Sequence, residues 1–164
     1  MNGTGMQGVT TDQGHQRTGE KENDEQSRRG RMPVVCGVHH VKLPVCDPAT
    51  SRDWYVRVLG FEQEIEFVED GVLMGVALHD PRSGVRFAVR RAPEQAEALR
   101  GFDPVALAVT TRAELDAWVE HLDAEGIEHS PVMNGHIGWV VGVHDPDGIE
   151  VRLYTLEPPA GAHE

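Results

Sequence analysis

The chain has few cysteines, few aromatic residues and no long apolar run. Its 164 residues include 2 cysteines, which is too few for a disulfide framework or a four-thiolate zinc site. Hydrophobic residues make up 39% of the chain, and no run of them approaches membrane-spanning length. No N-terminal stretch has the basic, then apolar, then small-residue order of a secretory signal peptide. We therefore expect a cytoplasmic protein with no membrane partner.

Basic residues are also scarce. Lys and Arg number 15 against 27 Asp and Glu, which gives a formal net charge of −12. Nucleic acids and anionic membranes attract basic surfaces, so this balance argues against either as the main partner. The length allows one compact domain or two small half-domains around a core large enough to fold unaided.

Residues 1–33 contain no Phe, Tyr, Trp, Leu or Ile, and their five basic and five acidic residues cancel. Such a segment buries too little apolar surface to offset the entropy lost on ordering. We therefore expect a disordered arm at 1–33, a folded domain at 34–156 and a C-terminal tail at 157–164.

The hydrophobic pattern of residues 34–92 predicts one β-α-β-β-β module. A first strand alternates over 38–45. Asp47 and Pro48 then provide an N-cap and a helix-starting proline, and Gly60 fits the position just past the helix end. Three further strands are expected, at 61–67, 72–78 and 85–90.

The pattern repeats over about 101–156. A strand at 105–109 precedes Thr111 and Glu114, which have the spacing of a capping box, and Gly126 closes the helix. Strands are expected at 127–132, 139–143 and 149–154, with the turn Asp145-Pro-Asp-Gly148 before the last. Val41 and Val105 are 64 residues apart, as are Trp54 and Trp118. We infer an internal duplication, hence an α+β fold of two tandem βαβββ modules.

The residues at these positions resemble a known family. His40-Val41 at a strand start, Trp54-Tyr55 in the helix, Val58-Leu59-Gly60-Phe61 at its end and the Asp145–Gly148 turn are similar to the vicinal oxygen chelate superfamily. This family includes glyoxalases, extradiol dioxygenases, fosfomycin resistance proteins and bleomycin-binding proteins. The resemblance implies that the curved sheets of the two modules enclose one cavity, with helices outside. It also implies a homodimer, and leaves open whether modules pair within or between chains.

The resemblance also points to four metal-ligand positions. In metal-using relatives, ligands lie on the first and last strands of each module, and the matching residues here are His40, Ala88, Pro104 and Arg152. Ala and Pro have no donor side chain, and Arg does not deprotonate to become one. We therefore predict no metal and no cofactor. His40 stays a candidate catalytic acid or base, since imidazole titrates near neutral pH; the alternative is an inert, hydrogen-bonded histidine.

The strand face opposite the helix-facing residues should line the cavity. We expect ligand contacts there from Lys42, Arg86, Glu150, Arg152 and Tyr154. Guanidinium groups suit a carboxylate or phosphate, so the cavity is expected to hold an anionic ligand. The alternatives are that Lys42, Arg86 and Arg90 lie in solvent at strand ends, and that Arg152 pairs with Glu150 or a neighbouring acid.

Three functions fit these residues. The first is a glyoxalase- or bleomycin-resistance-like protein that binds a small, anionic organic molecule without metal, for sequestration or acid/base chemistry. The second is a metal-dependent glyoxalase-like lyase or extradiol-type dioxygenase whose ligands include His40 and Glu150. The third is a non-catalytic structural or regulatory dimer. One fold supports all three, so the site has to distinguish them.

Overall fold

The structure is a computed structural model that describes residues 33–159. The chain divides into a segment that ends at Gly37 and a domain that starts at Val38. Residues 1–32 and 160–164 lie outside the described residues, so the expected disorder of the arm stays a prediction.

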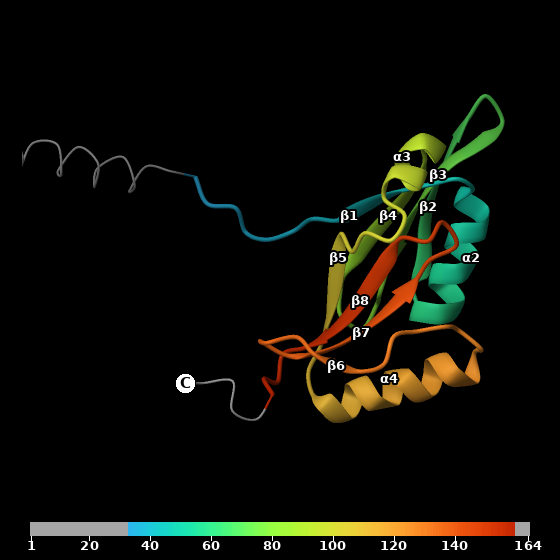
Figure 1. Ribbon diagram of the computed structural model, residues 1–164. Coiled ribbons are helices and arrows are strands. Elements are labelled where there is room, and N and C mark those ends of the chain that lie inside the picture. Colours follow the sequence, from blue (N-terminus) through green and yellow to red (C-terminus); the bar gives the residue numbers. More distant parts are fainter. Residues whose placement is uncertain (1–32, 160–164) are drawn as a thin grey trace, which may run out of the picture. The chain divides into compact units, whose positions relative to one another are not determined.

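Each half of the domain forms one βαβββ module (Figure 1). Module one contains β1 (Val41–Val45), α2 (Pro48–Leu59), β2 (Glu62–Glu69), β3 (Val72–His79) and β4 (Arg86–Arg91). Module two contains β5 (Val105–Val109), α4 (Arg112–Ala124), β6 (Met133–Asn134), β7 (Trp139–His144) and β8 (Glu150–Thr155). The sheets have strand orders β1-β4-β3-β2 and β5-β8-β7-β6, so the second repeats the first and the α+β duplication is confirmed.

The helix ends follow the capping residues of the sequence. Asp47 Oδ1 accepts a hydrogen bond from the Ala49 amide (3.1 Å), and α2 ends at Gly60, whose φ of 73° suits glycine. At the start of α4, the Thr111 hydroxyl accepts from the Glu114 amide (3.2 Å), and the Glu114 carboxylate accepts from the Thr111 amide (3.2 Å). This is the predicted capping box, and it fixes where the chain leaves β5.

The structure differs locally from the sequence prediction, first in β1, which begins at Val41 and not at 38. The expected strand at 127–132 is wrong: only an isolated bridge from His129 to Val143 forms there, and β6 starts at Met133. Pro131 has no amide hydrogen to donate to a ladder, and the Gly142 amide donates to the Ser130 hydroxyl instead of to a backbone carbonyl. The short helix α3 (Pro93–Ala98) between the modules was not predicted.

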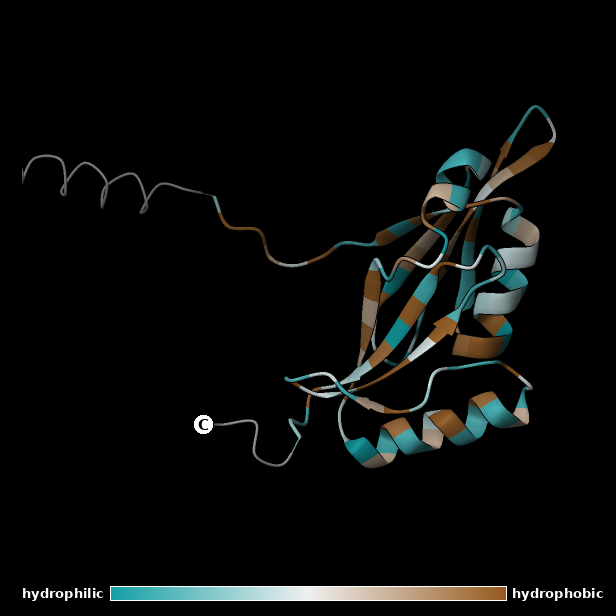
Figure 2. Cartoon of the chain, viewed as in Figure 1, coloured by the Kyte–Doolittle hydropathy of each residue, from teal (hydrophilic) through white to brown (hydrophobic). Residues whose placement is uncertain are grey.

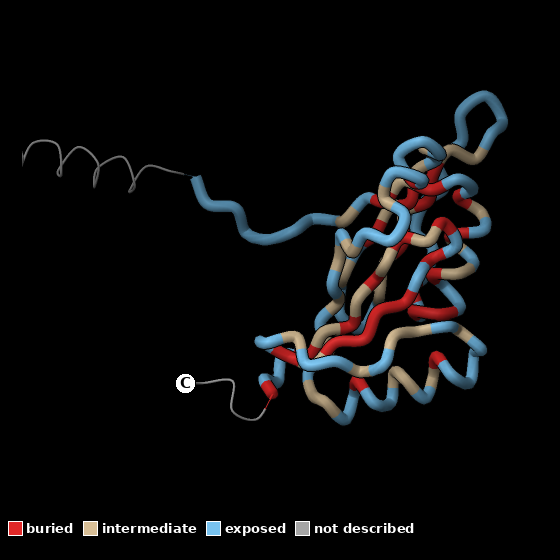
Figure 3. The backbone as a smooth tube through the Cα atoms, in the orientation of Figure 1, coloured by how far each residue is buried: buried red, intermediate tan, exposed pale blue. Residues whose placement is uncertain are grey.

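The two modules share one hydrophobic core. Side chains from the helix-facing sides of both sheets meet in it, and Val143 and Val151 of module two pack with Phe87 and Tyr55 of module one. Figure 3 shows the buried stretches of β7 and β8, and Figure 2 shows apolar and hydrophilic residues alternating along α4. No helix in residues 33–159 is long and apolar enough to cross a membrane.

The face of each sheet opposite this core is called the inner face. Along β8, Val151, Leu153 and Thr155 are buried, while Glu150 and Arg152 alternate with them on the inner face. A strand presents successive side chains to opposite faces, so burial of one set in the shared core turns the other set away from it. Both inner faces therefore point away from the contact between the modules.

Candidate functional site

The inner face of the first sheet carries a cavity of about 380 Å³. A row of paired residues crosses its floor, from Lys42 on β1 through Ala88 on β4 and Ala77 on β3 to Ile65 on β2. The two alanines leave space between larger neighbours, because their methyl groups barely rise above the sheet. The cavity lies within the size range of small-molecule sites.

His40 lies at the rim of this cavity, just before β1. Its Nδ1 is 2.9 Å from Nδ1 of the neighbouring His39, and both residues are exposed. One of these nitrogens has to donate the proton and the other has to accept it. An exposed imidazole at the rim has the access that proton transfer to a bound molecule requires.

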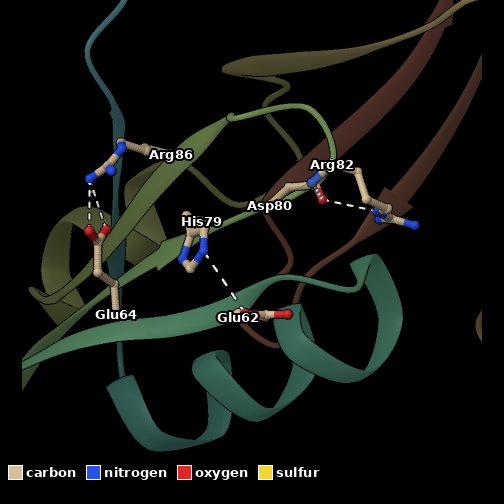
Figure 4. A network of polar contacts seen from close by, with 6 residues as sticks. All are labelled: Glu62, Glu64, His79, Asp80, Arg82 and Arg86. Carbon is tan, nitrogen blue, oxygen red and sulfur yellow. Dashed lines mark hydrogen bonds and ion pairs between the residues drawn. The ribbon is translucent and has the colours of Figure 1, made fainter.

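Two arginines of the first inner face already have acidic partners. Figure 4 shows Arg86 on β4 and Glu64 on β2 pointing toward each other. Arg86 Nη1 donates to both oxygens of the Glu64 carboxylate, at 3.0 and 2.9 Å. Further along β4, Arg90 Nη2 donates to Glu69 Oε1 at 2.7 Å. The positive charge predicted for this face is therefore largely neutralised by β2.

The inner face of the second sheet carries a three-residue ion-pair network. Arg152 Nε donates to Glu150 Oε1 (2.7 Å), and Arg152 Nη1 lies 2.6 Å from Asp103 Oδ2. The Glu150 carboxylate beside it raises the pKa of the Arg152 guanidinium. The predicted alternative for Arg152, pairing with Glu150, is present in the structure, and Asp103 is an additional partner that the sequence pattern did not indicate.

Tyr154 anchors a loop over the same inner face. Its hydroxyl donates a hydrogen bond to the carbonyl of Gly135, in the loop between β6 and β7. A Cβ at Gly135 would collide with the tyrosine ring, and so would one at Gly138. Glycine at both positions lets the loop lie directly on Tyr154.

The predicted site residues fall into two groups. His40, Lys42 and Arg86 line the cavity of module one, together with other residues of that module alone. The module-two residues, Glu150 and Arg152 among them, lie on the other inner face. A larger cavity of about 660 Å³ is lined by both modules, but none of the predicted site residues belongs to it. One chain therefore does not bring the two groups together.

The donor set does not fit a metal ion. Within residues 33–159, no three His, Cys, Asp or Glu side chains gather closely enough to hold one. Of the positions that match metal ligands in relatives, Ala88 lies on the cavity floor and Arg152 is engaged with two carboxylates. A guanidinium at a ligand position opposes a cation electrostatically, so these residues are poorly suited to hold a metal ion.

The acidic partners of the arginines are not apparent from the sequence. Glu64 and Glu69 lie five residues apart on β2, a strand with four glutamates that the sequence shows only as acidic. Asp103 directly precedes Pro104 and shows no spacing that links it to β8. The acidic character of this strand is visible in the sequence, but it does not show which arginine on another strand each glutamate contacts.

A comparison with models of protein families identifies the family of this chain. The profile of the Glyoxalase/Bleomycin resistance protein/Dioxygenase superfamily matches residues 37–153, nearly the whole described domain. The chain belongs to this superfamily. A search of curated protein sequences finds no significant match.

Solved structures of this superfamily share the fold. The glyoxylase/bleomycin resistance protein/dioxygenase domain of Frankia sp. EAN1pec is 23% identical, with 78% of this chain and 96% of that chain covered and a TM-score of 0.63. TnmS3, an antibiotic binding protein from Streptomyces sp. CB03234, is 20% identical over 76% and 98% of the chains, with a TM-score of 0.62. The fosfomycin resistance protein FosX of Listeria monocytogenes is 16% identical over 80% and 100%, with a TM-score of 0.58.

Proposed function

We propose that this superfamily member binds a small, anionic organic molecule on the inner face of its first sheet, without a metal ion. The observation that carries the proposal is the cavity above Ala88 and Ala77. Lys42 and His40 stand at its β1 edge, and the apolar side chains Ile65 and Phe67 stand on β2, the strand that also holds Glu64 and its partner Arg86. Such a mixture of apolar wall and few polar groups is typical of small-molecule sites.

The named relatives support a binding role. TnmS3 is an antibiotic binding protein and FosX is a fosfomycin resistance protein. By analogy, the proposed activity here is sequestration of a small molecule. We propose His40, at the rim, as the acid or base for any reaction of the bound molecule.

We further propose that two copies of the chain complete the site. Ile65 and Phe67 are 49% and 44% exposed on the first inner face, and Ala106 and Ala108 are exposed on the second. Pairing the first inner face of one copy with the second inner face of another would cover these apolar groups. It would also bring Glu150, Arg152 and Tyr154 of one copy toward His40, Lys42 and Arg86 of the other, around one cavity.

A thermal-shift screen tests the binding role. The full chain, purified and held in chelator, is screened against small organic acids that include fosfomycin, and calorimetry confirms any stabilising compound. Ala88→Leu should abolish binding, because its larger side chain fills the cavity floor. Ala98→Leu, on the exposed face of α3, is the matched control and should bind like the unaltered protein. Binding that depends on added divalent metal would contradict the proposal and favour the metal-dependent lyase or dioxygenase.

Analytical ultracentrifugation tests the pairing of two copies. The expected species has twice the 18.1 kDa mass of one chain. Phe67→Glu on the first inner face and Ala106→Glu on the second should each shift the protein toward monomer, since each buries a charge in the proposed interface. A monomer at micromolar concentration, still able to bind its ligand, would contradict the two-copy site.

A further inference from the structure

Lys42 differs from the other cations of the inner faces. Arg86, Arg90 and Arg152 each form an ion pair with at least one carboxylate. Among residues 33–159, Lys42 has no carboxylate within ion-pair distance, and it is exposed at the edge of the cavity. Within the described part of a single chain, Lys42 is therefore an uncompensated positive charge on the first inner face.

The pairing of the arginines lowers their value for ligand recognition. The Glu64 carboxylate accepts both of its hydrogen bonds from one nitrogen of Arg86. An incoming anion at Arg86 would be repelled by the carboxylate that already holds the guanidinium. An ammonium group without an acidic partner pays no such penalty and offers three donors to a carboxylate or phosphate.

The row across the sheet runs from the unpaired cation Lys42 to the apolar side chain of Ile65, beside which the ion pair of Arg86 with Glu64 is already formed. Lys42 is on β1 and Ile65 is on β2, at the two edges of a four-stranded sheet. Adjacent strands are about 4.8 Å apart, so three spacings place the two backbones about 14 Å apart. Between them lie only the side chains of Ala88 and Ala77 in this row.

We propose that the ligand is an elongated amphipathic molecule with a single acidic group at one end and an apolar, preferably aromatic, group at the other. The acid binds Lys42 and the apolar end packs on Ile65 and Phe67, so the molecule lies across the strands and is on the order of 10 Å long. Lys42 is then the residue that selects an anion. This inference rests on the proposed ligand binding and gives that ligand its chemical class.

The test uses phenylacetate, phenylbutyrate and phenyloctanoate, each with its neutral primary amide, and calorimetry on the full chain. Affinity should increase with chain length until the phenyl ring reaches Phe67, and the amides should bind far more weakly. Lys42→Met should weaken binding of the longest acid by about tenfold to a hundredfold, the value of one charge-assisted bond. Arg91→Met removes the same charge from the end of β4, outside the cavity, and should leave affinity unchanged.

A second measurement follows Lys42 chemically. It is the one lysine in residues 33–159, so reductive methylation of its amine can be followed in a single peptide by mass spectrometry. Phenyloctanoate should protect it. Phe67→Ala should flatten the dependence of affinity on chain length while leaving the preference for acid over amide intact.

The outcomes separate the inference from the proposed function. If the acids bind but Lys42→Met binds them as tightly as the unaltered protein, the role of Lys42 is overturned while ligand binding on the inner face stands. Equal affinity for acid and amide would overturn the anionic class. If the screen finds a ligand of different shape and none of these acids binds, the inference is overturned alone; if neither experiment finds a ligand, both proposals are overturned.

Discussion

The hydroxyl of Tyr55 donates a hydrogen bond to Asp145 Oδ2 (3.1 Å), and both residues are buried. Tyr55 belongs to α2 of module one and Asp145 to the turn before β8 of module two. The other oxygen, Asp145 Oδ1, accepts from the amides of Asp147 and Ile149, both at 3.0 Å. The turn is therefore tied to the helix of the other module, and Asp147 Oδ1 adds a bond from the Cys46 amide (3.0 Å).

Removing the Tyr55 hydroxyl should destabilise the contact between the modules. Tyr55→Phe leaves Asp145 buried with one donor fewer, which we expect to lower the free energy of unfolding by about 1.5–3 kcal/mol. Urea denaturation measures it. Tyr154→Phe is the matched control, because its hydroxyl bonds to a loop carbonyl at a half-buried position. An equal decrease in the free energy of unfolding of both variants would show that the bond between the modules stabilises the protein no more than the bond to the loop.

The free energy of unfolding should depend on pH through the protonation of Asp145. Burial raises the pKa of this carboxyl above its ordinary value, despite the hydrogen bonds it accepts. Because the folded pKa lies above the unfolded one, the stabilising effect of protonation is complete below the unfolded pKa and is lost as pH rises through the folded pKa. The stability of the unaltered protein relative to Asp145→Asn should therefore fall as pH rises from about 4.

Chemical denaturation of both proteins across this pH interval measures the difference, in which the contributions of other carboxylates cancel. A difference that stays constant with pH would contradict a raised pKa. A difference that grows with pH would mean that the hydrogen bonds of the carboxylate outweigh its burial.

Arg152 should be more important for stability than Arg86. Arg152→Met leaves two carboxylates without their cation, Glu150 and Asp103, whereas Arg86→Met leaves one, Glu64. All of these side chains are partly exposed, so solvent screens the effects and we expect about 1–2 kcal/mol for Arg152 and less than about 1 kcal/mol for Arg86. Melting temperatures of the two variants measure the contrast.

A rescue variant identifies the cause. Adding Glu150→Gln to Arg152→Met removes one of the unpaired charges and should restore part of the lost stability. If Arg152→Met instead leaves the melting temperature unchanged and weakens the binding of a ligand found by screening, Arg152 is a ligand-binding residue, as the sequence predicts.

Protein purified without chelator should contain no stoichiometric divalent metal at His40. The reason is the donor set: alanine, proline and arginine occupy the matching positions, and residues 33–159 hold no group of three suitable side chains. Elemental analysis measures the content. One tightly bound Zn²⁺, Mn²⁺, Ni²⁺ or Fe²⁺ per chain, lost in His40→Ala, would overturn this prediction.

The sequence by itself determined the architecture and the faces of its strands. The α2 and α4 boundaries follow from local hydrogen bonds of Asp47, Gly60 and Thr111, which act over a few residues. The two-residue period of the strands placed Lys42, Arg86 and Arg152 on inner faces, because this alternation holds wherever a strand has one buried side. The strand predicted at 127–132 does not form, because Pro131 has no amide hydrogen to donate to a neighbouring strand. The prediction followed the apolar residues of this segment and gave too little weight to the proline.

Tertiary structure alone decided how the charges pair and where the inner faces point. Arg86 and Glu64 are 22 residues apart in the sequence, and Arg152 on β8 pairs with Asp103, which precedes β5. Neither pair has a local spacing that the sequence would reveal. The direction of the inner faces depends on the packing of Val143 and Val151 against module one. Apolar side chains at these positions guarantee burial but do not specify the partner, since the hydrophobic effect is non-directional and the shape of the assembled modules selects the contact.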